Sequence, residues 1–275
     1  STAGVGRFTI AADGSLSTPT LGTSNVRFGV NAGNSIESGG NYNTVVGDEA
    51  GTAITTGDEN TFIGYISGSA NTTGSNNTAI GRASLYNNTT GTYNTAVGRG
   101  AGQAVTTGTS NTLIGGLAGD AITTGIGNVA VGYNALTVHT TGNNNVAIGN
   151  VALESNTTAS DIVAVGVAAL RLNTTGADNV AVGAYSLDAN TTGASNTAVG
   201  DNSLTANTTA DNNTGIGYYA LKANTTGASN VALGYTALQT NTTAADNTAV
   251  GVSAMYANTT GTSNVSVGRS ALQNN

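Results

Sequence analysis

The chain has 275 residues, of which only 8% are charged, and it carries a formal net charge of −7 with no cysteine. The absence of cysteine excludes disulfides and thiolate metal ligands, and the negative balance without any run of Lys or Arg argues against a nucleic-acid partner. No stretch approaches the ~20 apolar residues of a membrane-spanning helix, so we expect no membrane insertion.

Residues 1–42 differ from the rest of the chain in composition and do not follow its repeat. They hold the only proline, Pro19, and a predicted Asp13-Gly14 turn between two short extended segments. An early motif at 25–29 ends in Gly29, which precedes Gly47 by one position more than the spacing that holds from Gly47 onward. We therefore predict that 1–42 is an entry segment that caps the remainder and starts its register.

Residues 43–275 repeat one unit without a break. A glycine recurs at every seventeenth position from Gly47 to Gly268, which gives fourteen units, the last incomplete. We number each unit from the residue four places before that glycine, so that the glycine is position 5. Since one short unit cannot bury a core alone, units must stack on their neighbours. This predicts an all-β chain, a parallel β-roll or β-solenoid with 17-residue coils.

Positions 1 to 4 of each unit alternate as a strand does, and the unit at 179–195 is a clear example. The β-branched Val180 and Val182 share one face, and Ala181 lies on the other. Because the alanine side is so small, we expect the backbone of a second chain to pass close to it. Gly or Ala at positions 5 and 15 predicts corners, with a second short strand near positions 9 to 14.

Each coil offers only a handful of apolar side chains. Burying one Val or Leu is worth ~1.5 to 3 kcal/mol, whereas ordering the backbone costs on the order of 1 to 2 kcal/mol per residue. A stack made from a single chain is marginal on these terms. We therefore expect the chains to associate, most simply as a homotrimer.

Polar residues repeat as strictly as apolar ones. Thr-Thr fills positions 13 and 14 in all thirteen complete units, and Asn fills position 1 in thirteen of fourteen, with Ile162 as the exception. Stacked coils would align these residues into ladders, in which each asparagine amide bonds to those above and below. The predicted structural ladders include Asn179, Asn196, Asn230, Thr191 and Thr192.

Positions 9 and 12 vary together. Where position 9 is Gly, as at Gly51, position 12 is an aliphatic residue such as Ile54, and where position 9 is Leu, position 12 is usually Asn. We interpret this exchange as two ways of filling one buried volume. Gly68 with Asn71 departs from the rule, which predicts an underfilled coil at that point.

His139, the only histidine, occupies position 12. Without a cysteine or carboxylate cluster beside it, we interpret it as a tolerated ladder substitution. The sequence predicts no enzyme, no catalytic residue, no cofactor and no metal site, because no acid, base and nucleophile occur together. The adjacent acidic pairs, Asp48 with Glu49 and Asp58 with Glu59, are interpreted as solvated charge, with a weak cation site as the alternative.

Tyrosines occur at the variable positions 6, 7 and 10. Their rings are suited to stacking on sugars, and the alternative interpretation is that they shield corners of the roll. The candidate residues for a surface or glycan contact are Tyr218, Tyr219, Tyr235 and Tyr185.

The unit, read as NTAVG at 247–251 and NTTG at 258–261, resembles the repeats of phage tail-fibre shafts, notably those of cyanophages. It is similar, more loosely, to the heads of trimeric autotransporter adhesins, whose β-roll has a shorter period. The resemblance covers about residues 25–275. It implies a homotrimeric β-roll fibre that displays or contacts a host surface, and it carries no catalytic residue across.

These features favour a structural shaft of a phage or phage-like tail fibre, located on the virion. The expected partners are further copies of the chain and a host-surface glycan or protein. A bacterial cell-surface adhesin or extracellular filament with the same fold is the alternative. Ice binding is a remote third hypothesis. Ice-binding solenoids usually carry Thr-x-Thr on one flat face, whereas the adjacent Thr-Thr of this repeat would point to opposite faces of a strand.

Overall fold

A computed structural model of the chain describes residues 9–10, 16–17 and 21–274. The chain divides into two compact units, Ser1–Ile126 and Gly127–Asn275, and each is described by itself. All regular structure in the described ranges is β-strand, so they contain no helix long and apolar enough to cross a membrane.

The first unit begins with two short strands that pair antiparallel, β1 (Thr9–Ile10) and β2 (Leu16–Ser17). The predicted Asp13-Gly14 turn and Pro19 lie outside the described residues. The next strand, β3 (Val26–Phe28), already pairs in parallel with the strand of the following coil, and Val26 lies opposite Thr44. The motif at 25–29 therefore forms a coil of the solenoid within the segment predicted to be its cap.

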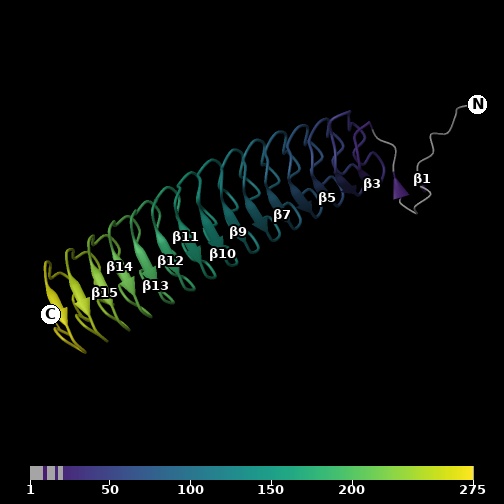
Figure 1. Ribbon diagram of the computed structural model, residues 1–275. Helices are drawn as coiled ribbons and strands as arrows, with labels where there is room; N and C mark the ends of the chain where they lie inside the picture. Colours follow the sequence, from purple (N-terminus) through teal and green to yellow (C-terminus); the bar gives the residue numbers. More distant parts are fainter. Residues whose placement is uncertain (1–8, 11–15, 18–20, 275) are drawn as a thin grey trace, which may run out of the picture. The chain divides into compact units, whose positions relative to one another are not determined.

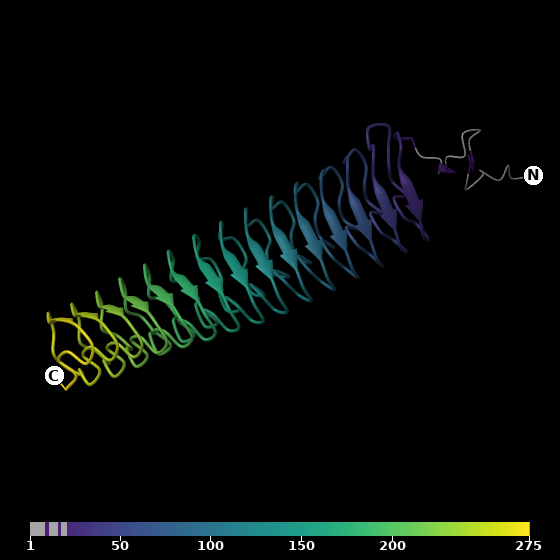
Figure 2. The same ribbon diagram turned by 60° about the horizontal axis from the view of Figure 1, so that its bottom comes forward.

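The remaining strands of the first unit recur with the period of the glycines, and each pairs in parallel with the next. They are β4 (Thr44–Val46), β5 (Thr61–Ile63), β6 (Thr78–Ile80), β7 (Thr95–Val97) and β8 (Thr112–Ile114). In Figures 1 and 2 each coil consists of one arrow followed by a longer loop.

The second unit continues the same pattern with nine parallel strands in register. They are β9 (Val129–Val131), β10 (Val146–Ile148), β11 (Val163–Val165), β12 (Val180–Val182), β13 (Thr197–Val199), β14 (Thr214–Ile216), β15 (Val231–Leu233), β16 (Thr248–Val250) and β17 (Val265–Val267). The predicted fold class, an all-β parallel β-solenoid with 17-residue coils, is confirmed.

The expected second strand near positions 9 to 14 is wrong, because those residues form turns and loops. In every repeat unit the backbone at positions 7 and 9, and at position 17 where the unit is complete, has φ between 46° and 70°. Residues in this left-handed region reverse the chain and cannot extend a strand. Most of them are not glycine, as Tyr185 and Leu187 illustrate.

The interior of each coil is narrow and holds the side chains at positions 1, 3, 8, 9 and 12. In the unit at 179–195, Ala181 and Leu187 are fully buried, whereas Val182 is 37% exposed on the outer face. The expectation that the alanine side packs against a second chain is therefore wrong. Alanine is small because the opposite wall of its own stack is close: a Cβ added at Gly215 would lie 2.7 Å from Ser203 Oγ.

The exchange between positions 9 and 12 follows from the same narrow interior. A Cβ added at Gly51 would lie 2.7 Å from Ile54 Cδ1, so the isoleucine occupies the space that a leucine at position 9 fills elsewhere. The predicted underfilled coil at Gly68 is wrong as well. Phe62 in β5 is fully buried, and its ring lies 2.6 Å from where a Cβ of residue 68 would stand.

Candidate functional site

Two ladders of buried asparagines hold neighbouring coils together, at positions 1 and 12. In the position 1 ladder, Asn196 Nδ2 donates to Asn179 Oδ1 at 3.1 Å and to the Ala210 carbonyl at 2.9 Å. Asn196 Oδ1 in turn accepts the backbone N–H of Asn213 at 2.9 Å, and Asn230 repeats the pattern two coils later. Each amide therefore satisfies backbone groups that would otherwise be buried without a partner.

The threonine pairs divide between two environments. Thr191 is half-buried, and its hydroxyl donates to the Thr208 carbonyl of the next coil at 3.0 Å. Thr192 is exposed. In this pair the first threonine therefore stabilises the stack, and the second lies on the surface.

His139 takes the place of an asparagine in the position 12 ladder. It is fully buried; its Nε2–H donates to the Gly142 carbonyl at 2.8 Å, and its Nδ1 accepts from Asn156 Nδ2 at 3.0 Å. These bonds require the neutral imidazole, because a carbonyl can only accept and an amide nitrogen can only donate. Burial is the main cause that lowers the pKa of His139, against the opposing effect of its bond to Gly142.

We expect His139 to make the stability of the second unit depend on pH. Because the folded-state pKa of His139 lies below its unfolded value of about 6.5, the unfolded chain binds an additional proton below that pH. Stability is thus fully present above about pH 6.5 and falls on acidification, by up to about 1.4 kcal/mol per pH unit. His139→Asn should remove this slope and keep the bond to Gly142. Thermal unfolding at pH 7.5 and 5.5 measures the difference, and identical slopes for both proteins would refute it.

The adjacent acidic residues bind backbone amides. Asp48 Oδ1 accepts from the N–H of Val30 at 3.1 Å, and Asp58 Oδ1 accepts from that of Asn41 at 2.7 Å. Within the described residues no three side chains of His, Cys, Asp or Glu come together as metal ligands would.

Three of the four candidate tyrosines form one exposed cluster in the second unit. The rings of Tyr218 and Tyr219 stack with centroids 3.9 Å apart, and the ring of Tyr235 lies parallel to that of Tyr218 within 8° at 5.6 Å. Tyr218 and Tyr235 are 41% and 54% exposed. Tyr185 does not join them: it occupies position 7 two coils before Tyr219 and makes no ring contact in the described part of the chain.

Position 6 explains why these rings meet. Tyr218 and Tyr235 occupy this position in successive coils, so the repeat places one ring beside the other, and Tyr219 follows at position 7. Lys222 was not a candidate from sequence, yet its ammonium lies 4.0 Å from the Tyr219 ring centroid, as a cation–π contact requires. The sequence does contain a signal for this contact: Lys222 follows Tyr219 by three positions, on the other side of the turn at position 9.

The hydroxyl of Tyr218 stays protonated at neutral pH. The side-chain hydrogen bond with Tyr219, followed by burial and the negative charge of Asp201, raises the pKa of Tyr218 to about 12. The cluster therefore offers ring faces, hydroxyl groups and one ammonium. This combination suits a sugar ring, which presents apolar C–H faces together with hydroxyl groups.

Comparison of the chain with protein-family models, with curated proteins and with solved structures found no match.

Proposed function

We propose that this chain forms the shaft of a homotrimeric tail fibre of a phage or phage-like particle and contributes to attachment at a host surface. The observation that carries the proposal is the outer face of the parallel sheet. From β4 to β17 the outward positions 2 and 4 hold only Thr, Val, Ile and Leu, and none is charged. Exposed members in the second unit, between 36% and 45% exposed, include Ile148, Val182, Ile216 and Leu233.

An apolar face of this kind favours a partner, because parallel sheets normally have both faces covered and exposed apolar patches mark interaction sites. The spacing of the rows points to the nature of that partner. Rows of side chains repeat once per coil, about every 4.8 Å, so a second copy of the same solenoid matches them row for row. The threefold arrangement rests on the resemblance to tail-fibre shafts and adhesin heads.

Attachment to a host surface is supported by the exposed cluster of Tyr218, Tyr219 and Tyr235 and by the same resemblance. The cluster presents sugar-compatible ring faces and hydroxyl groups on the surface of the repeat. A shaft that carries such clusters would bind the host surface along its length, in addition to spanning the distance to it.

The test of association is the mass of the full chain in solution. We expect sedimentation to give a trimer for the natural chain and monomers for the variant Val182→Lys with Ile216→Lys, since three chains would bring these charges together at a dry interface. The matched control is Thr192→Lys with Thr226→Lys, which places the same charges on exposed turns of the same coils and should remain trimeric. A stable, folded monomer of the natural chain would contradict the proposal.

The owner of the fibre requires a separate measurement. Antibodies against the full chain should label the tails of purified particles in electron micrographs. Label on bacterial envelopes, with none on particles, would replace the tail-fibre proposal with the cell-surface adhesin.

A further inference from the structure

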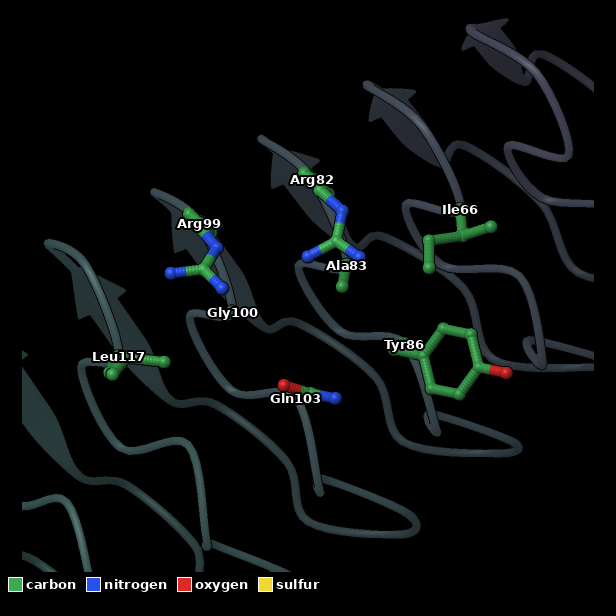
Figure 3. Close-up of a pocket in the computed structure, with 8 residues that line it drawn as sticks. All are labelled: Ile66, Arg82, Ala83, Tyr86, Arg99, Gly100, Gln103 and Leu117. Atoms are coloured by element: carbon green, nitrogen blue, oxygen red, sulfur yellow. The ribbon is translucent and has the colours of Figure 1, made fainter.

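The first unit carries a hollow of about 90 Å³ on its surface. Its floor is formed by position 7 of two successive coils, where Ala83 and Gly100 are the smallest residues, and its ends by Ile66 and Leu117 at the same position of the coils on either side. Figure 3 shows this arrangement. The hollow exists because two small residues follow one another in a column that is bounded by larger ones.

Arginines form one rim of the hollow. Arg82 and Arg99 occupy position 6 of successive coils, and Tyr86 and Gln103 line the hollow across from them at position 10. Backbone bonds hold the coils in register, since the Gly100 N–H donates to the Arg82 carbonyl at 2.9 Å. The Cα atoms of the two arginines are therefore about one strand spacing, ~4.8 Å, apart.

The two guanidinium groups are exposed and lack acidic partners. Among the described residues neither forms a hydrogen bond or an ion pair, and none of the residues that line the hollow is acidic. By contrast, Arg171 occupies position 10 of its coil and pairs with Asp188 one coil later at 2.9 Å. The chain has only seven Lys and Arg residues, and two of them repel each other at this rim.

From this geometry we infer that the hollow bordered by Arg82 and Arg99 on one rim binds an oxyanion group, a carboxylate or a sulfate, of an acidic glycan. Two guanidinium groups side by side supply the donor geometry that such anions accept best. The hollow is far smaller than the roughly 300 to 1,000 Å³ that enclose a whole small ligand. One charged group therefore enters it, and the rest of the polymer lies over the surface.

Aromatic rings beside the arginines favour a sugar polymer over other polyanions. The Tyr65 ring is 51% exposed and lies 5.9 Å from the Arg82 guanidinium carbon, and Tyr86 is half-exposed at the opposite rim. These faces are available to pyranose rings on either side of the charged group. A nucleic acid is disfavoured, because two cations on a chain of net charge −7 release few counterions.

This inference deepens the proposed attachment role, on which its biological meaning rests, by naming the class of host ligand. The test measures binding of the full chain to immobilised oligogalacturonate, with the methyl-esterified oligomer as the uncharged probe. We expect binding to the acid form only, and weaker binding at high salt because exposed charges are screened. Dextran sulfate and dextran form the second arm, which assigns the oxyanion as sulfate or carboxylate.

Matched variants locate the site. Arg82→Gln with Arg99→Gln should weaken binding at least 10-fold. Gly100→Leu should weaken binding to the same extent with both arginines present, because the leucine side chain fills the hollow. The backbone should accept this leucine, since Leu117 occupies the same position of the next coil with a similar φ. Arg269→Gln removes an exposed arginine from position 6 of a coil without this hollow and should leave binding within 2-fold.

Several outcomes would overturn the inference: equal binding of the esterified oligomer, equal binding of poly-L-glutamate, or no loss of binding in either rim or floor variant. Circular dichroism of each variant establishes that it is folded. The site lies within one unit of one chain, so its binding does not require a trimer. A monomer that binds oligogalacturonate as described would refute the proposed trimer and leave this inference standing.

Discussion

Gly98→Ala is expected to unfold the coil in which it lies, at a cost of more than about 3 kcal/mol. Gly98 has φ of +137°, a conformation that residues with a side chain essentially do not adopt, and the strain alone amounts to ~1–3 kcal/mol. An added Cβ would also lie 2.6 Å from the carbonyl carbon of Gly115 in the next coil, with the carbonyl oxygen closer still. Backbone atoms held by the stack cannot move away.

Gly100→Ala is the control for this prediction, at position 7 of the same coil. Its φ of +68° is close to that of Ala83 and Ala168 at the same position, and an added Cβ would meet only the flexible ends of Leu117 and Gln103. We expect a loss of about 1 kcal/mol, the usual cost of a left-handed residue. Urea unfolding followed by circular dichroism compares the two variants, and equal losses would show that the glycine at position 5 is not required.

Asn196→Ala is the second substitution with a large expected effect, a loss of about 2–4 kcal/mol. The side chain is fully buried, and its Oδ1 accepts the N–H of Asn213, which would be left buried without that partner. The other two bonds cost less to lose. Asn179 Oδ1 still accepts the backbone N–H of residue 196, and the Ala210 carbonyl still accepts from Asn207.

The same unfolding measurement checks this prediction, with Thr209→Ala as the control in the same coil. Thr209 is exposed at position 14, so its truncation should change stability by no more than about 0.5 kcal/mol. A loss for Asn196→Ala as small as that of the control would mean that the ladder amides contribute little, and that the stack is held by its backbone bonds alone.

Several features of the fold follow from the sequence without the structure. The 17-residue period, a strand within positions 1 to 4 and the stacking of asparagines are local and repetitive, so one unit such as 179–195 contains the information for all. The corner at position 5 can also be predicted from the sequence, because a glycine recurs there in every unit. The structure gives the physical reason: φ is +134° at Gly183, a value that residues with a side chain essentially do not adopt.

The tertiary structure alone decided which face of the strand lies inside. Val180, Ala181 and Val182 alternate, and alternation defines two faces without saying which is buried when neither is charged. It also decided that positions 9 to 14 are turns, because Leu187 and its equivalents take a left-handed φ that leucine rarely adopts and that only a buried, stacked environment maintains.

The candidate sites divide in the same way. Sequence identified the tyrosines, and the period explains why Tyr218 and Tyr235 meet, since both occupy position 6. The hollow at Arg82 and Arg99 arises from the sizes of the side chains at position 7 in four separate coils, which become neighbours only when the coils stack. Residues close together in the chain therefore determine the repeat period and the strand. Packing between coils determines which face of the strand is buried, which turn residues take a left-handed φ, and where the surface is hollow.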